Sequence, residues 1–239
     1  MAAAFVLVAG SSMASEAMHW GYSGDGGPDN WAKLNAAYEM CGKGVNQSPI
    51  DLTAFVESEL APITFHYSGL ATEVVNNGHA IQANYTAGST IEAAGKTFEL
   101  KQFHFHSPSE NTINGESFPM ESHFVHAAQD GSLAVIAVMY KIGDENEGMA
   151  KLWKQMPAKA GDKVAMASQV KADDLLPQDR DYYRFNGSLT TPPCTEGVLW
   201  MVMKQPVTVS KEQVEAFTHV MHHPNNRPVQ PVNARPVLQ

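Results

Sequence analysis

The segment KQFHFH at residues 101–106 alternates polar and aromatic side chains from Gln102 onward. Such alternation is typical of a β-strand, in which successive side chains point to opposite faces of the sheet. Gln102, His104 and His106 therefore share one face, and the two phenylalanines share the other. We expect two imidazoles from a single strand to point into the same space.

A second strand-like segment, ESHFVH at residues 121–126, supplies a third histidine. On such a strand Glu121 and His123 share a face, whereas His126 is out of phase and is not counted as a ligand. If the two strands pair as neighbours, His123 joins the other two imidazoles. Three neutral imidazoles with an open fourth position describe a catalytic zinc site. The alternative is a solvated polar face or an adventitious metal site.

Metal-binding histidines need their second ring nitrogen anchored, because that contact fixes the tautomer and the angle of the ring. Gln102 and Glu121 are placed to provide such anchors, and Glu121 would serve His123.

The rest of the chain predicts a β-dominated fold. Apolar, β-branched and aromatic runs bounded by Gly, Asn, Pro or Asp predict strands at 63–66, 73–75, 80–85, 97–106, 122–127, 133–141 and 198–204. Short helices are predicted at 29–40, 144–156 and 210–222, and Ser210 with Gln213 forms a capping box for the third. Because no linker or repeat divides the chain, we expect a single domain with a few peripheral helices.

Composition limits the classes of partner. The 239 residues are 44% hydrophobic and 17% charged, which is enough for a sizeable core. The net charge is −9, whereas nucleic-acid-binding proteins typically carry an excess of basic residues. A small neutral or anionic partner therefore fits better. Outside the N-terminus no run of about 18 apolar residues occurs, so no membrane-spanning helix is expected.

The N-terminal residues 1–14 combine a short apolar run with small residues, as the core and cleavage region of a secretory signal do. No basic residue precedes the run, so we interpret the segment as a signal-peptide remnant, with a chance apolar start as the alternative. The two cysteines, Cys41 and Cys194, do not form a C-x-x-C motif. An oxidising compartment would let them pair, and two buried thiols are the alternative.

Between Trp20 and about Gln230 the chain resembles the alpha carbonic anhydrase family, and in particular its bacterial secreted branch. The resemblance rests on the order of several short matching stretches along one chain. These stretches are residues 19–22, 46–50, 76–79, 102–106, 121–126, 188–197 and 226–231.

The resemblance implies a large, twisted, mainly antiparallel sheet and reversible hydration of carbon dioxide to bicarbonate and a proton. It implies one Zn²⁺ per chain, bound by His104, His106 and His123, with zinc-bound hydroxide attacking carbon dioxide. Thr190 would orient the hydroxide and pass its own proton to Glu110. His79 matches the family's proton shuttle. The substrate-binding positions of the family match Val125, Val135, Leu189, Thr190, Thr191, Val198 and Trp200. The positions that order water in the cleft match Tyr22, Asn77, Gln82 and Thr191.

The resemblance also matches Cys41 and Cys194 to the cysteine pair of bacterial members, and it implies cis peptide bonds before Pro49 and Pro193. It implies a catalytic domain at 15–239 in a periplasmic or secreted protein, and it is compatible with a homodimer. Two other functions stay open. One is a zinc hydrolase that acts on small esters, and the other is a non-catalytic zinc-binding module of the same fold.

Overall fold

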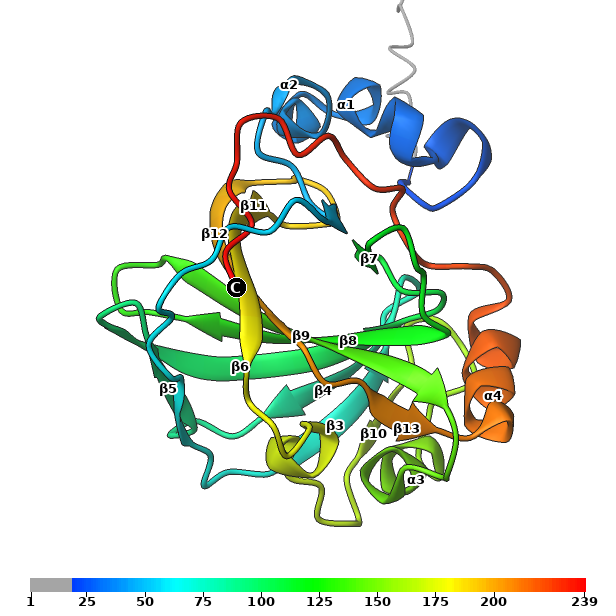
Figure 1. The fold of residues 1–239 in the computed structure, drawn as a ribbon. Coiled ribbons are helices and arrows are strands. Elements are labelled where there is room, and N and C mark those ends of the chain that lie inside the picture. The colour runs from blue at the N-terminus through cyan, green and yellow to red at the C-terminus, as the bar shows by residue number, and fades with distance from the viewer. Residues whose placement is uncertain (1–18) are drawn as a thin grey trace, which may run out of the picture.

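The computed structural model describes residues 19–239, so the expected signal remnant at 1–14 lies outside the described residues. Most strands join one 11-stranded sheet, and Figure 1 shows this sheet running through the middle of the molecule. The order along the sheet is β10 (Lys163–Ala165), β3 (Ala71–Asn76), β4 (Ile81–Tyr85), β6 (Lys96–His106), β8 (Met120–Ala127), β9 (Leu133–Ile142), β12 (Glu196–Met203) and β11 (Tyr182–Ser188).

Three further strands extend the sheet from its sides. They are β2 (Thr64–His66), β5 (Thr90–Ala93) and β13 (Val207–Val209). A separate pair consists of β1 (Asp51–Leu52) and β7 (Thr112–Ile113). Within the large sheet only β12 and β13 run parallel to their neighbour β9, so the sheet is mixed but mainly antiparallel. The predicted fold class is therefore confirmed.

Two of the α-helices cover one face of the sheet. They are α3 (Glu147–Trp153) and α4 (Lys211–Met221), and Figure 1 shows them together at one side of the molecule. The capping box expected for α4 is present, because the Ser210 side chain accepts a hydrogen bond from the Gln213 N–H and the Gln213 side-chain oxygen accepts one from the Ser210 N–H. Within residues 19–239 no helix has both the length and the apolar character needed to cross a membrane.

The helix expected at 29–40 is wrong as a single element. The chain there forms α1 (Trp31–Leu34) and α2 (Met40–Lys43), with short 3₁₀ turns before and between them. Asn35 separates the pieces, because its backbone is extended and its side chain caps the next turn by accepting from the Ala37 N–H. The helix α3 likewise begins later than expected, since the cap is Asn146.

The core lies on both faces of the sheet. On β9, Ile136 and Val138 pack into the cluster beneath α3 and α4, while Val135, Ala137 and Met139 pack into a second cluster on the other face. Because β9 is buried on both sides, its apolar run shows no polar alternation. The second face is the one that also carries the histidines described next.

Candidate metal centre

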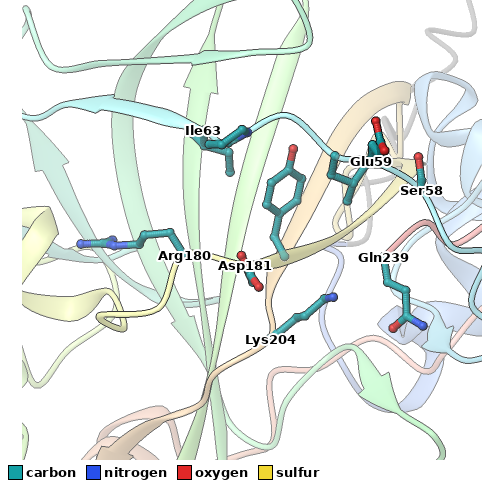
Figure 2. Close-up of a pocket in the computed structure, with 10 residues that line it drawn as sticks. Ser58, Glu59, Ile63, Arg180, Asp181, Lys204 and Gln239 are labelled. Carbon is teal, nitrogen blue, oxygen red and sulfur yellow. The ribbon is translucent and has the colours of Figure 1, made fainter.

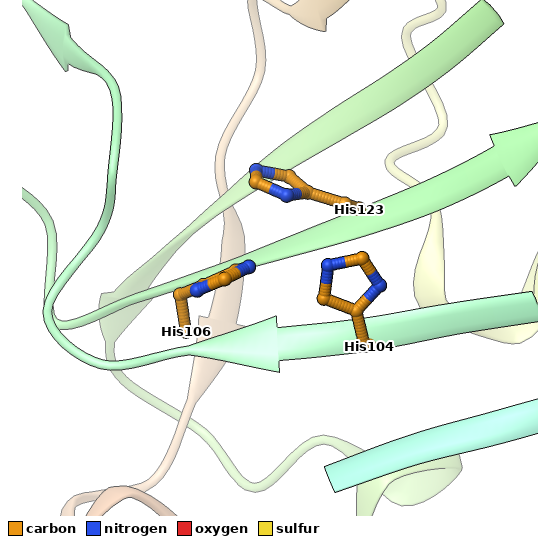
Figure 3. Close-up of side chains that lie close together, drawn as sticks. All are labelled: His104, His106 and His123. Atoms are coloured by element: carbon orange, nitrogen blue, oxygen red, sulfur yellow. The ribbon is translucent and has the colours of Figure 1, made fainter. Parts of the chain in front are cut away.

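The pairing of β6 with β8 brings the three predicted histidines together. His104 lies opposite His123 in this antiparallel register, and His106 lies opposite Glu121. One ring nitrogen from each histidine lies within 4.8 Å of the other two, a spacing that could hold a metal ion. Figure 3 shows the three rings converging on one space.

Each of these rings has one nitrogen bound to an acceptor and the other nitrogen left for the shared space. The contacts are His104 Nδ1 to Gln102 Oε1 at 2.8 Å, His106 Nδ1 to the Asn225 carbonyl at 2.7 Å, and His123 Nε2 to Glu121 Oε1 at 2.9 Å. Gln102 and Glu121 therefore lie where the strand pattern places them. The anchors fix the tautomers and leave Nε2, Nε2 and Nδ1, respectively, facing inward.

Burial keeps these imidazoles uncharged. It lowers the pKa of His104, His106 and His123, so that all three rings are neutral near pH 7. Neutral imidazole is the form that binds a metal. The electrostatic environment therefore suits a metal centre as well as the geometry does.

The anchor Glu121 is itself held by several donors. Its carboxylate accepts from the N–H groups of Glu110 and Asn111, from the Asn111 side chain, and from His123. Burial raises the pKa of Glu121 to about 7, and the hydrogen bonds from Asn111 oppose that rise. Since its acceptor sites are filled, Glu121 holds the His123 ring in one orientation.

A second buried carboxylate, Glu110, faces the histidines. Its Oε1 accepts from the Arg227 N–H at 2.8 Å, and its Oε2 lies 3.5 Å from His106 Nε2 and 3.9 Å from His123 Nδ1. Burial raises the pKa of Glu110 to about 8, against opposing effects of the Arg227 N–H and the Thr190 hydroxyl. That hydroxyl is near enough to act on the carboxyl but does not meet hydrogen-bond geometry with it.

Two polar atoms at the centre, His106 Nε2 and Glu110 Oε2, are buried and have no hydrogen-bond partner among residues 19–239. Buried polar atoms are rarely left unsatisfied, and an ion in the shared space would satisfy the imidazole nitrogen. The donor set fits zinc, which takes neutral imidazoles and, in catalytic sites, three protein ligands.

A cavity of about 130 Å³ opens beside the histidines. Its lining includes the four residues expected to order water there, together with His79 and two of the clustered histidines. The lining residues are Trp20, Tyr22, Asn77, His79, Ala80, Gln82, Gln102, His104, His106 and Thr191. A larger hollow of about 460 Å³, shown in Figure 2, contains none of them and is lined by residues such as Arg180 and Lys204.

The expected apolar wall is also assembled. Val135, Val198 and Trp200 belong to one buried cluster, and Val125 and Leu189 pack against it. The Trp200 ring meets the His123 ring edge to face, with 4.9 Å between ring centroids. The wall thus lies directly beside the histidine centre.

His79 lies at the rim of the cavity, where its ring stacks on Trp20 with 3.5 Å between centroids. Burial lowers the pKa of His79 to about 4, and the neighbouring rings of His19 and His223 add to this effect. These two neighbours could not be predicted, because His19 and His223 lie in segments that are distant in the sequence and meet only in the fold.

His126 lies outside the cluster, as the strand phase predicts. It is fully buried on the opposite face of β8, where Nε2 contacts the Tyr67 hydroxyl at 2.6 Å. This second buried histidine on the same strand as His123 offers a matched control for tests of the metal centre.

A disulfide joins Cys41 to Cys194, which confirms the expected pair. Arg227, fully buried, donates to the Cys41 carbonyl, the Gln47 side chain and the Ser48 carbonyl, while its N–H holds Glu110. Arg227 therefore holds both the segment around the disulfide and the buried Glu110 carboxyl group. The expected cis bonds before Pro49 and Pro193 are present, together with a third before Pro108.

Comparisons with known proteins agree with this geometry. Residues 26–239 match the family model for eukaryotic-type carbonic anhydrase. A carbonic anhydrase of Klebsiella pneumoniae is 48% identical over 93% of this chain and 92% of its own length. The solved alpha-carbonic anhydrase of Thermovibrio ammonificans, in complex with the inhibitor sulfanilamide, superposes with a TM-score of 0.91 at 49% identity over 92% of this chain and 99% of that one.

A structure of dioscorin complexed with ascorbate superposes with a TM-score of 0.86 at 33% identity, over 92% of this chain and 97% of that one. The fold is therefore shared with a protein that is not named as an anhydrase. The match of the family model and the identity to bacterial anhydrases nevertheless decide the relationship. The chain belongs to the eukaryotic-type, or alpha, carbonic anhydrase family.

Proposed function

We propose that this protein catalyses the reversible hydration of carbon dioxide, with one Zn²⁺ per chain bound by His104, His106 and His123. The observation that carries the proposal is the set of three neutral imidazoles, each anchored on one ring nitrogen and free on the other. Zinc bound there would lower the pKa of a coordinated water to about 7, the value known for carbonic anhydrases themselves, and so supply a nucleophile at neutral pH.

Thr190 and Glu110 would orient the attacking water. Glu110 is buried, and one of its oxygens is held by the Arg227 N–H, so the other oxygen would accept a hydrogen bond from the Thr190 hydroxyl. A hydroxyl that donates to Glu110 can only accept from the water, so the water lone pair would be aimed at the substrate carbon. This step needs Thr190 to move into hydrogen-bond geometry with Glu110.

The apolar wall would hold carbon dioxide. Val135, Val198 and Trp200 are buried beside His123, and Val125 and Leu189 complete the surface. A charged product at such a surface would lose hydrogen bonds to water without gaining others in return. The surface therefore favours an apolar substrate over a charged product. The Thr190 N–H would donate to an oxygen of bicarbonate, and Thr191, Tyr22, Asn77 and Gln82 would order the water of the cavity.

His79 would carry the released proton to solvent. While its ring is stacked on Trp20, its pKa of about 4 makes acceptance of a proton from a group of pKa about 7 unfavourable. Because burial is the main cause of the low pKa, a ring that leaves Trp20 for water would return towards 6.5. We therefore propose that His79 relays protons in an unstacked orientation.

The relay has a kinetic signature. His79→Ala should lower kcat in dilute buffer and leave kcat/KM for carbon dioxide nearly intact, because proton release follows the departure of bicarbonate. Added imidazole should restore much of the loss as a mobile carrier. An unchanged kcat in dilute buffer would mean that His79 is not the relay.

Hydrolysis of small esters is the main alternative, since the same nucleophile can attack an accessible carbonyl. The small cavity beside the histidines favours the smaller substrate. Stopped-flow carbon dioxide hydration and hydrolysis of p-nitrophenyl acetate should be compared on the same zinc-loaded preparation. We expect kcat/KM to be far higher for carbon dioxide, and ester hydrolysis without hydration would favour the alternative.

The disulfide and the bacterial relatives are consistent with a protein outside the cytoplasm. We propose that the protein is periplasmic or secreted, that residues 1–14 are the remnant of its export signal, and that 15–239 form the catalytic domain. Cell fractionation tests this, and full recovery in the cytosol with two alkylated thiols would contradict it.

A further inference from the structure

A chain of hydrogen-bonded polar side chains leads away from the cavity wall, and the proposed chemistry uses only its first two members, Asn77 and Gln82. Asn77 Nδ2 donates to Gln82 Oε1 at 3.5 Å, Gln82 Nε2 donates to Asn84 Oδ1 at 2.7 Å, and Asn84 Nδ2 donates to Glu73 Oε1 at 2.7 Å. We call these four residues the amide ladder. It begins at the turn between β3 and β4 and ends on β3, at the partly exposed Glu73.

Both ends of the ladder require the same direction of hydrogen bonding. The Glu73 carboxylate can only accept. At the other end, Asn77 Oδ1 accepts from the N–H groups of His79 at 2.9 Å and Ala80 at 2.8 Å, which can only donate. Every amide between these ends must therefore turn its nitrogen towards Glu73 and its oxygen towards the His79 turn. The orientation of three amides, which is otherwise ambiguous, is fixed by the network.

The ladder lies beside the path from the metal centre to His79. Asn77 and Gln82 line the same cavity as His79 and His104, and Gln82 is the register partner of His104 across β4 and β6. The amide direction thus sets which hydrogen-bonding groups Asn77 and Gln82 can offer to water in the cavity.

Two other side chains hold the same turn without contacting the Asn77 amide. Asn76 Oδ1 accepts from the Gly78 N–H at 3.1 Å, and Asn225 Nδ2 donates to the His79 carbonyl at 3.0 Å. Neither of them touches the Asn77 amide group. The side-chain contact that does so is Gln82, through the ladder.

Within residues 19–239, Glu73 forms one ion pair, with Lys163, whose Nζ lies 3.5 Å away and whose side chain is 68% exposed. An ion pair of this kind is screened by water and contributes little. The shorter, charge-assisted hydrogen bond from Asn84 is the stronger contact. Glu73 therefore acts mainly on the ladder.

We propose that Glu73 is a positioning residue for proton release, which acts through Asn84 and Gln82 to hold Asn77 and the His79 turn. The inference rests on the proposed role of His79 as the proton relay. Glu73 touches neither substrate nor metal ligands, so its effect should be confined to the step that follows bicarbonate departure.

The kinetic test uses Glu73→Gln, which keeps the size of the side chain but can donate as well as accept, so the ladder loses its fixed direction. In dilute buffer kcat should fall about fivefold, the factor that one hydrogen bond of ordinary net strength represents. The value of kcat/KM for carbon dioxide should be unchanged, and imidazole should restore kcat. The control Glu92→Gln removes the same charge from an exposed position on β5, where Glu92 lies 3.7 Å from His66, and it should leave both constants unchanged.

A second measurement does not depend on turnover. Amide hydrogen exchange of His79 and Ala80 in the zinc-loaded protein should quicken about fivefold in Glu73→Gln and in Asn84→Ala, because both variants weaken the hold on Asn77. Exchange should be unchanged in Glu92→Gln. If one variant fails to fold, the other still tests the ladder.

The proposal is overturned if exchange at His79 and Ala80 is unchanged, if kcat in dilute buffer is unchanged, or if kcat and kcat/KM fall together. A wild-type protein without carbon dioxide hydration would instead refute the proposed function. A His79→Ala effect without a Glu73→Gln effect would refute the ladder alone.

Discussion

Glu110 and Thr190 are the pair of side chains that we propose to orient the nucleophile. The carboxylate is buried, with one oxygen held by the Arg227 N–H and the other facing the histidines. Neither residue supplies one of the three imidazoles. A variant of either should therefore separate metal binding from catalysis.

Thr190→Val and Glu110→Gln should each keep one zinc per chain and lose about 10²-fold in kcat/KM, the scale of removing one preorganised hydrogen bond from an active site. Zinc content and stopped-flow hydration measure the two effects. The matched control is Thr195→Val, in the same turn but on the exposed surface. Unchanged turnover in both active-site variants would mean that the nucleophile is oriented by something else.

His126 makes the stability of the protein depend on pH. Burial lowers its pKa to about 3, below the unfolded value of about 6.5. The unfolded chain therefore binds the proton more readily, so this contribution is fully present above pH 6.5 and is lost as the pH falls towards 3. Between pH 6 and pH 4 the unfolding free energy should fall by up to about 1.4 kcal/mol per pH unit more steeply than in His126→Gln. Denaturant titrations with equal slopes would contradict this.

The anchors of the three clustered histidines show what could be predicted at the residue scale. Gln102 and Glu121 follow from the alternation of their own strands, because each lies two positions from its histidine. Asn225 could not be predicted, because it acts through a main-chain carbonyl and lies 119 positions from His106. Every residue type carries such a carbonyl.

Among the elements, β6 was predictable because buried residues alternate with more exposed ones along most of its length. The strand β8 is buried along most of both faces, and its run of β-forming residues predicted it. The strand β11 was not predicted, since Arg184, Asn186 and Gly187 interrupt its apolar residues. Its pairing with β12 supplies the stability that the local sequence lacks. The prediction of one helix at 29–40 was wrong because composition alone favoured a helix there. The Asn35 cap divides that run into shorter pieces.

The disulfide ties α2 to the turn that follows Thr190 across a separation of 153 residues. Replacing both cysteines by alanine should lower the unfolding free energy by at most about 5 kcal/mol, the chain-entropy value for a loop of that length. Guanidinium titrations of the oxidised protein and the double variant measure the difference. Reducing agent should leave the double variant unaffected, and coincident curves for the two oxidised samples would contradict the prediction.

At the scale of the whole molecule, segments far apart in sequence complete the site. Residues before β1 supply Trp20 and Tyr22 to the cavity, and the C-terminal segment supplies Asn225 and Arg227. Strand periodicity cannot report such meetings, since they depend on how the ends of the chain cross the finished sheet. The resemblance to a known family placed Tyr22 in the cleft, whereas the surroundings that lower the pKa of His79 emerged only from the fold.

Zinc-dependent hydration of carbon dioxide at the three-histidine centre can be measured by stopped flow. The samples are the zinc-loaded protein, the chelator-stripped protein and the stripped protein after zinc is returned. The same series is run on His123→Gln and on His126→Gln, which carry the same substitution on opposite faces of β8.

The wild-type protein and His126→Gln should bind one zinc per chain, lose activity with the metal and regain it on re-addition. His123→Gln should bind zinc far more weakly and stay inactive at the same zinc concentration. Full hydration activity in the stripped wild-type protein, or stoichiometric zinc with full activity in His123→Gln, would rule out a zinc-dependent reaction at this centre.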